Sequence, residues 1–125
     1  MKTRIILTAL GLMGLGTASY AEDAEQGAKV FKKCMACHTV ENTTNKIGPS
    51  LMGIVGRKAA TVEGYKYSDA MLAKAAEGVI WDEATLGAYL PDPKKFVPGT
   101  KMAFPGLKKP EDVANIIAFL KTKGM

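Results

Sequence analysis

Both cysteines of the chain and its only histidine fall within five consecutive residues, Cys-Met-Ala-Cys-His at positions 34–38. Two thiols separated by two residues and followed directly by an imidazole are typical of the covalent attachment of a c-type haem. The thiols of Cys34 and Cys37 would add to the two vinyl groups along one side of the macrocycle, and His38 would ligate the iron. The spacing therefore predicts one covalently bound haem.

The same residues have three other interpretations, which the motif alone leaves open. A redox pair of the thioredoxin type would place Cys-x-x-Cys at the start of a helix within a βαβ unit, and no such pattern is found here. A structural zinc site needs four nitrogen or sulfur ligands, and this chain offers three. A disulfide between Cys34 and Cys37 would close a very short loop and stabilise the fold little.

The second axial position of the iron is either vacant or filled by a residue other than histidine. Met52 and Met71 lie in apolar or helical surroundings, where methionine usually fills space in a core. Met102 lies in an irregular segment between Pro-Gly pairs at positions 98–99 and 105–106, where no helical face needs an apolar side chain. Met102 is therefore the predicted second ligand, the alternative being a loop methionine that packs on the haem edge.

The first 21 residues have the composition of a secretory signal peptide. Lys2 and Arg4 precede an apolar run over residues 5–16 that is too short to cross a bilayer. Ser19 and Ala21 supply the small residues that a signal peptidase reads. We expect cleavage of residues 1–21, export to the periplasm and a mature single-domain chain of residues 22–125, an uncleaved anchor being the alternative.

The charge balance argues against nucleic acid as a partner. Without Lys2 and Arg4, the formal net charge of +5 falls to +3, which is a small excess. Local clustering of lysines can still form a positive face that attracts acidic partners.

A first helix is predicted over residues 23–33. Asp23 is the expected N-cap, and Gln26 stands three residues later in the capping-box position. Gly27 lies inside this helix at a cost of about 1 kcal/mol relative to alanine. Its presence predicts that another segment of backbone passes close by.

A last helix is predicted from Pro110 to the residue before Gly124. Its apolar residues recur at i, i+3, i+4 and i+7, namely Val113, Ile116, Ile117 and Leu120. Two shorter helices are predicted over residues 68–77, capped by Ser68, and 82–90, closed by Pro91 and Pro93. Segments 41–58 and 91–106 are rich in glycine and proline and are expected to be irregular, so the predicted fold class is all-α.

Together these segments resemble the class I c-type cytochromes, in particular the bacterial cytochrome c2 group and mitochondrial cytochrome c. The resemblance covers nearly the whole mature chain. It rests on CMACH, IGPSLMGIVGRK, EGYKYSDA, VIWDEATLGAYLPDPKKFVPGTKMAF and VANIIAFLK, in the family's order. It implies the class I cytochrome c fold, in which crossed N- and C-terminal helices, shorter helices and long loops are wrapped around one covalently bound haem c. It also implies that Met102 is the second axial ligand.

The resemblance assigns roles to further positions. Pro49 matches a proline whose carbonyl accepts a hydrogen bond from the axial histidine, and Gly27 matches the point where the terminal helices cross. The residues matched to contacts with the haem, its propionates or its methionine ligand are Arg57, Tyr67, Trp81, Tyr89, Thr100 and Phe104. Met71 departs from the family pattern, which often has an asparagine that binds an internal water there, so the resemblance does not fix the reduction potential.

The implied function is that of a soluble periplasmic one-electron carrier rather than an enzyme, because iron with two axial ligands has no position for a substrate. The implied donor is a membrane cytochrome bc-type complex. The implied acceptor is a photosynthetic reaction centre, a terminal oxidase or another periplasmic reductase, bound transiently by a monomer. Seven lysines are expected to surround the exposed haem edge and to attract acidic partners: Lys33, Lys46, Lys94, Lys95, Lys101, Lys108 and Lys109. A vacant axial position would instead indicate a haem enzyme or gas binder, and unattached thiols a periplasmic thiol oxidoreductase.

Overall fold

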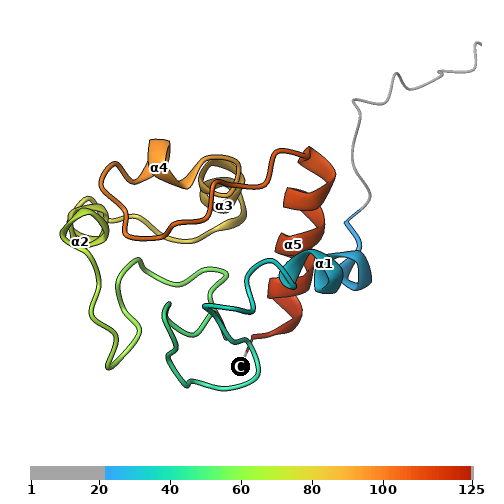
Figure 1. Ribbon diagram of the computed structural model, residues 1–125, viewed down its shortest axis with the longest axis horizontal. Helices are drawn as coiled ribbons and strands as arrows, with labels where there is room; N and C mark the ends of the chain where they lie inside the picture. Colours follow the sequence, from blue (N-terminus) through green and yellow to red (C-terminus); the bar gives the residue numbers. More distant parts are fainter. Residues whose placement is uncertain (1–21, 125) are drawn as a thin grey trace, which may run out of the picture.

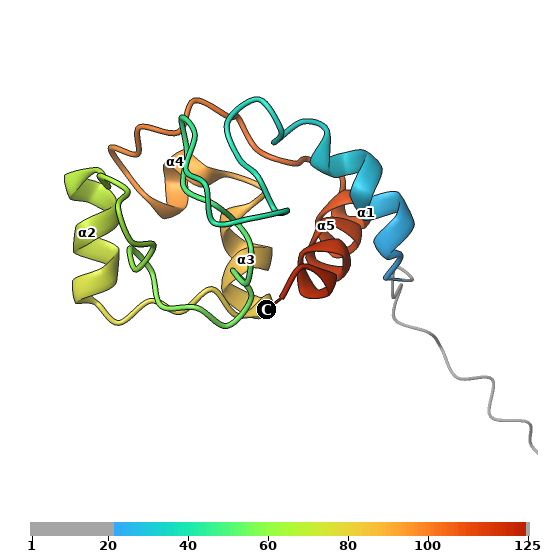
Figure 2. The ribbon, with the colours of Figure 1, turned by 90° about the horizontal axis from the view of Figure 1, so that it is seen from below.

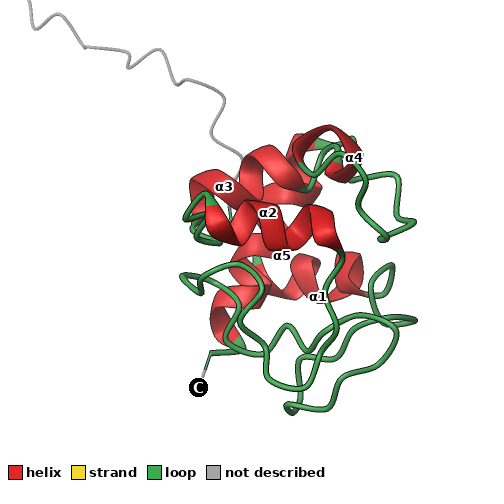
Figure 3. Cartoon of the chain, turned by 90° about the vertical axis from the view of Figure 1, so that its left-hand side faces the viewer, coloured by secondary structure: helices red, strands yellow, loops and turns green. Residues whose placement is uncertain are grey.

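The computed structural model describes residues 22–124, and within them the chain forms helices joined by long loops (Figure 1). The helices are α1 (Ala24–Phe31), α2 (Asp69–Ala76), α3 (Glu83–Tyr89), α4 (Pro93–Phe96) and α5 (Pro110–Thr122). Over the same residues, strand-like pairing is limited to one isolated antiparallel bridge between Lys58 and Ile80. Much of the loop chain lies to one side of the helices in Figure 3, and a further loop runs beside α4. The predicted all-α class is therefore confirmed.

The two terminal helices, α1 and α5, cross in direct contact (Figures 1 and 2). Gly27 lies at the crossing, where a Cβ atom would stand 1.9 Å from the carbonyl oxygen of Asn115 and 2.6 Å from Cβ of Phe119. The rings of Phe31 and Phe119 pack beside it with centroids 5.3 Å apart. The close backbone approach predicted at Gly27 is thus confirmed, because only a glycine leaves room for the last helix.

The start of α1 differs from the prediction in one respect. Asp23 is the N-cap, and its carboxylate accepts hydrogen bonds from the backbone N–H groups of Glu25 and Gln26 at 2.9 and 3.2 Å. The backbone N–H of Asp23 itself donates to Oδ1 of Asn115, 3.0 Å away on α5. Of the capping box expected with Gln26, the hydrogen bond from the Gln26 N–H to the Asp23 carboxylate is present. The return bond is not, because Asn115 of the neighbouring helix takes the place of the Gln26 amide at the Asp23 N–H.

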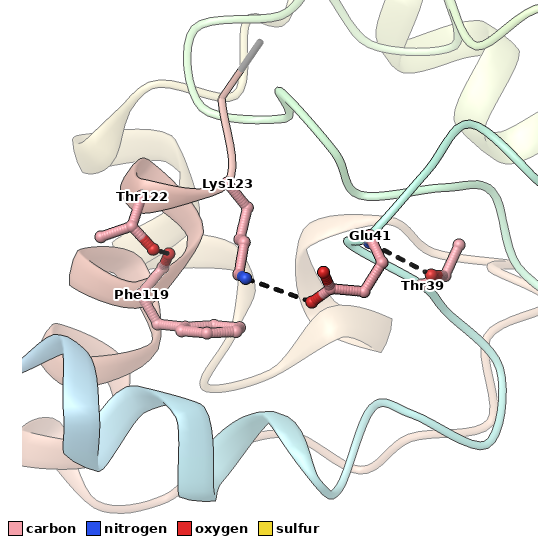
Figure 4. Close-up of polar contacts among 5 residues, drawn as sticks. All are labelled: Thr39, Glu41, Phe119, Thr122 and Lys123. Atoms are coloured by element: carbon pink, nitrogen blue, oxygen red, sulfur yellow. Dashed lines mark hydrogen bonds and ion pairs between the residues drawn. The ribbon is translucent and has the colours of Figure 1, made fainter.

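Helix α5 begins at Pro110, as predicted, and the four residues of the apolar period are its buried face. Contacts join the C-terminal end of α5 to the loop that follows the Cys-x-x-Cys-His segment (Figure 4). Lys123 pairs with the Glu41 carboxylate at 3.1 Å, and the Lys123 carbonyl accepts a hydrogen bond from the Gly53 N–H at 2.7 Å. The Lys123 ammonium also lies 5.6 Å from the centre of the Phe119 ring. These contacts connect the last helix to the long first loop.

The two shorter helices begin where the sequence predicts. Ser68 caps α2 by accepting from the Met71 N–H at 3.1 Å, and Asp82 caps α3 by accepting from the Thr85 N–H at 2.8 Å. The sequence predicts only helix stops at prolines 91 and 93, but a further short helix, α4, lies there. Pro93 is in fact the first residue of α4, where a missing N–H costs nothing.

The membrane-related prediction concerns residues that the structure does not describe. The signal peptide expected over residues 1–21 lies outside the described range. Among residues 22–124, no helix combines the length and the apolar character needed to span a bilayer.

Candidate haem-binding site

A largely apolar cavity of about 510 Å³ lies between the helices and the long loops. Its wall is built from the segment after α1, the loop over residues 47–54, the segment 65–71, helix α3 and the segment 100–107. Twelve residues from the predicted set line it, namely Lys33, Cys34, Cys37, His38, Pro49, Tyr67, Trp81, Tyr89, Thr100, Lys101, Met102 and Phe104. The fold therefore brings residues from most of the chain together around one cavity.

The Cys-x-x-Cys-His segment forms a tight turn directly after α1. The N–H of Cys34 donates to the Phe31 carbonyl at 2.8 Å, and the N–H groups of Cys37 and His38 both donate to the Cys34 carbonyl, at 3.1 and 2.9 Å. This turn places both half-buried thiols and the imidazole at the same cavity wall. Cys34 and Cys37 are not joined by a disulfide. Burial raises the pKa of the Cys34 thiol, and the charge of Lys33 partly opposes that rise.

The orientation of His38 is fixed by the loop that packs against it. Nδ1 of His38 lies 2.7 Å from the carbonyl oxygen of Pro49. A carbonyl only accepts hydrogen bonds, so Nδ1 carries the proton and Nε2 keeps its lone pair. Burial lowers the pKa of His38, which favours this neutral form. The Pro49 contact implied by the resemblance is present in the structure.

Gly48 is a site residue that the sequence interpretation missed. A Cβ atom at Gly48 would stand 2.4, 2.7 and 2.9 Å from Cε1, Nδ1 and Nε2 of His38. The position of the residue is fixed by hydrogen bonds from its N–H to the Cys37 carbonyl, at 2.8 Å, and from the Lys46 N–H to its own carbonyl, at 2.9 Å. A glycine directly before a proline in a loop was the available signal, and only the fold shows that the missing side chain makes room for the imidazole.

Met102 is held by hydrogen bonds in the segment 100–107, which also lines the cavity. The hydroxyl of Tyr89 donates to the Met102 sulfur at 3.6 Å, and the Met102 N–H donates to Oγ1 of Thr100 at 3.2 Å. Burial raises the pKa of Tyr89 to about 12, so its hydroxyl remains a donor at neutral pH. The structure thus brings together Met102 and the two residues that the resemblance places beside it.

Three aromatic side chains pack against one another near Met102 and support this part of the cavity wall. The ring centroids of Trp81 and Tyr89 are 4.8 Å apart, and Phe96 of α4 lies 6.2 Å from Trp81 and 5.8 Å from Tyr89. Lys74 of α2 stands over the Phe96 ring at 5.1 Å from its centroid. Phe96 was not singled out in the sequence, because its position depends on the unpredicted helix α4.

Arg57 is the one predicted haem-contacting residue that does not line the cavity. Its guanidinium donates to the carbonyl of Ser50 at 3.3 Å and to the carbonyl of Met52. Tyr67 does line the cavity, and its hydroxyl accepts from the Val62 N–H at 3.0 Å. Burial raises the pKa of Tyr67, and the charge of Arg57 opposes that rise, so Arg57 acts on the cavity wall through its charge.

The seven predicted docking lysines are all exposed, but they are not equally close to the cavity. Lys33 and Lys101 line it. The Lys101 ammonium stands 4.6 Å from the centre of the Tyr65 ring and donates to the Lys66 carbonyl. Lys46 donates to the Met35 carbonyl at 2.6 Å. Lys94 and Lys95 lie on α4, and Lys109 is the N-cap of α5. Lys108 donates to the carbonyls of Pro91 and Pro105 at 2.7 and 3.1 Å.

Met71, the position that departs from the family pattern, also lines the cavity. It lies in the first turn of α2, with its side chain half-buried against the core. A thioether in place of an amide makes this part of the wall apolar.

The donor set around this cavity fits a covalently attached haem, since two thiols, an imidazole nitrogen and a thioether all line one mostly apolar space. A helical fold with crossed terminal helices around such a cavity defines a class I c-type cytochrome. The cytochrome c family model matches residues 24–123, and the chain belongs to this family.

Individual relatives agree with this assignment. The chain is 52% identical over 103 residues to a cytochrome c of Nigella damascena, covering 81% of this chain and 90% of the relative. It is 54% identical over 92 residues to cytochrome c2 iso-2 of Magnetospirillum fulvum, covering 74% and 93%. Among solved structures, cytochrome cH from Methylobacterium extorquens is similar with a TM-score of 0.73 and 50% identity, covering 80% of this chain and 98% of the other. The chain is therefore a haem-based electron carrier with a covalently bound c-type haem.

Proposed function

We propose that this protein is a periplasmic one-electron carrier and not an enzyme, with residues 22–125 as a single mature domain. Cys34 and Cys37 form the thioether bonds, and His38 and Met102 are the axial ligands of the iron. When bound, the haem supplies a one-electron couple between ferric and ferrous iron. With both axial positions filled, no position remains for a substrate.

The observation that carries this proposal is the hydrogen bond between His38 and Pro49. Because Nδ1 donates to the Pro49 carbonyl at 2.7 Å, Nε2 has the free lone pair that a metal ligand needs. The Met102 sulfur lines the same cavity and is oriented by Tyr89. A thioether paired with an imidazole favours the reduced iron and hence a positive reduction potential.

The remaining side chains exclude water and hold these donors in place. The side chains of Trp81, Tyr89 and Phe104 form apolar parts of the cavity wall. Thr100 holds the backbone of Met102 at 3.2 Å. Tyr67 and Arg57 provide polar and positive groups for the propionates. A wall held by packing and by backbone contacts keeps the same geometry in both redox states, which makes the exchange of an electron fast.

The proposed donor is a membrane cytochrome bc-type complex, and the proposed acceptor is a photosynthetic reaction centre or a terminal oxidase. The exposed lysines would attract acidic surfaces on these partners. We expect transient binding by a monomer, with rates that fall steeply as the salt concentration rises. Rates that do not depend on salt would contradict docking by these lysines.

Optical and mass spectra of the exported protein test the proposal. We expect a mass that corresponds to residues 22–125 plus one haem, and a ferric spectrum with low-spin iron and a methionine-to-iron charge-transfer band. A Met102→Ala variant should lose that band, and a Met52→Ala variant, as the matched control, should keep it. High-spin iron in the unaltered protein would instead support a haem enzyme or gas binder, and a colourless product with two free thiols a thiol oxidoreductase.

A further inference from the structure

Residues 97–109 join α4 to α5 without a helix and carry Met102; we call them the Met102 segment. In Figure 1 this segment runs from α4 past α3 to the start of α5. Irregular chain of this length has many conformations available, and ordering each residue costs free energy. Contacts with the rest of the fold must therefore hold the Met102 segment if Met102 is to keep one position.

The residues directly before Met102 are held by two hydrogen bonds. The Thr100 N–H donates to the Val97 carbonyl at 2.9 Å, and the Lys101 ammonium donates to the Lys66 carbonyl. Both bonds lie on one side of Met102 along the chain. The position of Met102 therefore also depends on how the chain after it is held.

The chain after Met102 lies directly against the turn that follows α3. The Leu107 N–H donates to the Leu90 carbonyl at 2.8 Å, and the Leu107 side chain is buried. A Cβ atom at Gly106 would stand only 2.2 Å from the Pro91 carbonyl oxygen. The two backbones therefore meet without a side chain between them, which a glycine at this position allows.

Lys108 connects the same two stretches of backbone through its side chain. Its ammonium donates to the Pro91 carbonyl at 2.7 Å and to the Pro105 carbonyl at 3.1 Å. Pro91 belongs to the turn after α3, and Pro105 belongs to the Met102 segment. Hydrogen bonds from a charged donor are stronger than those between neutral groups. Lys108 therefore holds the Met102 segment against this turn.

The turn matters for Met102 because α3 also carries the residue that orients the sulfur. Tyr89 is the last residue of α3, and its hydroxyl donates to the Met102 sulfur at 3.6 Å. A separation of the Met102 segment from the end of α3 would lengthen and weaken this hydrogen bond. The contact that Lys108 holds therefore helps to determine where the sulfur lies in the cavity wall.

We propose that Lys108 is a positioning residue for Met102, because its two hydrogen bonds keep the Met102 sulfur in place on the cavity wall. The inference rests on the proposed ligation of the iron by Met102. It adds to the docking role expected for Lys108, since an ammonium has three N–H donors and two of them are used here. Without the ammonium, the Met102 segment leaves the turn more often, and Met102 leaves the iron more often with it.

Binding of imidazole to the ferric holoprotein tests this inference. Imidazole ligates the iron only in molecules that Met102 has left, so its apparent affinity measures the fraction of such molecules. The methionine-to-iron charge-transfer band follows the titration at about pH 8, where imidazole is largely neutral. Lys108→Met keeps the apolar stem and removes the ammonium. Because Lys108 is exposed and its charge is partly screened, we expect this variant to bind imidazole roughly three to ten times more tightly than the unaltered protein.

Two further variants separate the hydrogen bonds of Lys108 from its charge. Lys108→Arg can donate to both carbonyls and should bind imidazole with the affinity of the unaltered protein. Lys121→Met is the matched control, since the Lys121 ammonium also bonds to α3, where it lies 3.0 Å from the Glu83 carboxylate at the other end of the helix. This control loses the same charge and should leave the affinity unchanged.

Equal imidazole affinities of the Lys108→Met and unaltered proteins would overturn the inference alone. Equal shifts in Lys108→Met and Lys121→Met would do the same, because the lost charge would then explain both. A Lys108→Arg protein that binds imidazole as tightly as Lys108→Met would also contradict positioning by the hydrogen bonds. An unaltered ferric protein without the charge-transfer band would overturn ligation by Met102 and this inference together.

Discussion

Gly27, at the crossing of α1 and α5, allows a prediction whose magnitude follows from the structure. In Gly27→Ala the new Cβ would stand 1.9 Å from the Asn115 carbonyl oxygen, whereas ordinary contacts begin at 3.4 Å. The obstacle is the backbone of a helix, which cannot turn aside as a side chain can. The two helices must therefore separate by roughly 1.5 Å, which loosens the Phe31–Phe119 contact and the buried face of α5.

The expected cost follows from two opposing effects. Alanine is favoured over glycine within a helix by about 1 kcal/mol. Overpacking usually costs about 1–3 kcal/mol, and a clash with backbone belongs at or above the upper end of that range. We expect Gly27→Ala to lower the free energy of unfolding by about 2 kcal/mol and Tm by roughly 10 °C.

Gly87→Ala is the matched control. Gly87 also lies inside a helix, α3, but a Cβ there would meet no atom within 4 Å. The Gly87→Ala variant should have a free energy of unfolding that is about 0.5–1 kcal/mol higher, from helix propensity alone. Guanidinium denaturation of both holoproteins, followed by circular dichroism, measures the two changes. Shifts of the same sign for both glycines, or a Gly27→Ala protein as stable as the unaltered one, would refute the steric reasoning.

Three further predictions concern the cavity wall and the cap of α3. Gly48→Ala should displace the His38 ring, because the new Cβ would stand 2.4 Å from Cε1 of His38. Electron paramagnetic resonance of the ferric protein should then show altered g-values. Unchanged g-values would contradict the contact. Tyr89→Phe removes the donor 3.6 Å from the Met102 sulfur. With Met102 as the proposed ligand, the thioether would then donate more strongly to the iron, and the reduction potential should fall by an amount equivalent to about 1 kcal/mol or less. Cyclic voltammetry measures this change, and a rise would contradict it. Hydrogen bonds from Thr85 hold the pKa of Asp82 below its ordinary value, so the folded state binds fewer protons there than the unfolded state. This contribution to stability is lost as the pH falls through the lowered pKa. Urea denaturation from about pH 5 to about pH 2 should therefore show a shallower loss of stability for Asp82→Asn than for the unaltered protein, and parallel curves would contradict it.

The parts of the fold that could be predicted are those that local chemistry determines. Capping by Ser68 depends on residues within one turn, and the buried face of α5 follows from its apolar period. Gly27 could be interpreted because a glycine inside a helix has a cost that needs a reason. The resemblance, rather than the residues alone, supplied the contact between Pro49 and His38.

The parts that could not be predicted depend on contacts distant in sequence. Asn115 takes the place expected for the Gln26 side chain at the start of α1, which no local pattern reveals. Helix α4 is a single turn whose first residue is a proline, and proline both ends and begins helices. Arg57 does not line the cavity, and its guanidinium donates to two loop carbonyls that no local pattern in the sequence reveals.

The acceptor that orients His38 is a main-chain oxygen, and this has a consequence for how the protein can be altered. Every amino acid at position 49 carries the same carbonyl group, so no replacement there deletes the acceptor. The basicity of the imidazole can then be tuned by moving the peptide. Residues that determine the path of the loop would do this, such as Asn45, whose Oδ1 accepts from the Ser50 N–H at 3.0 Å. A search for variants with altered potential is thus better directed at the neighbours of the proline than at the proline itself.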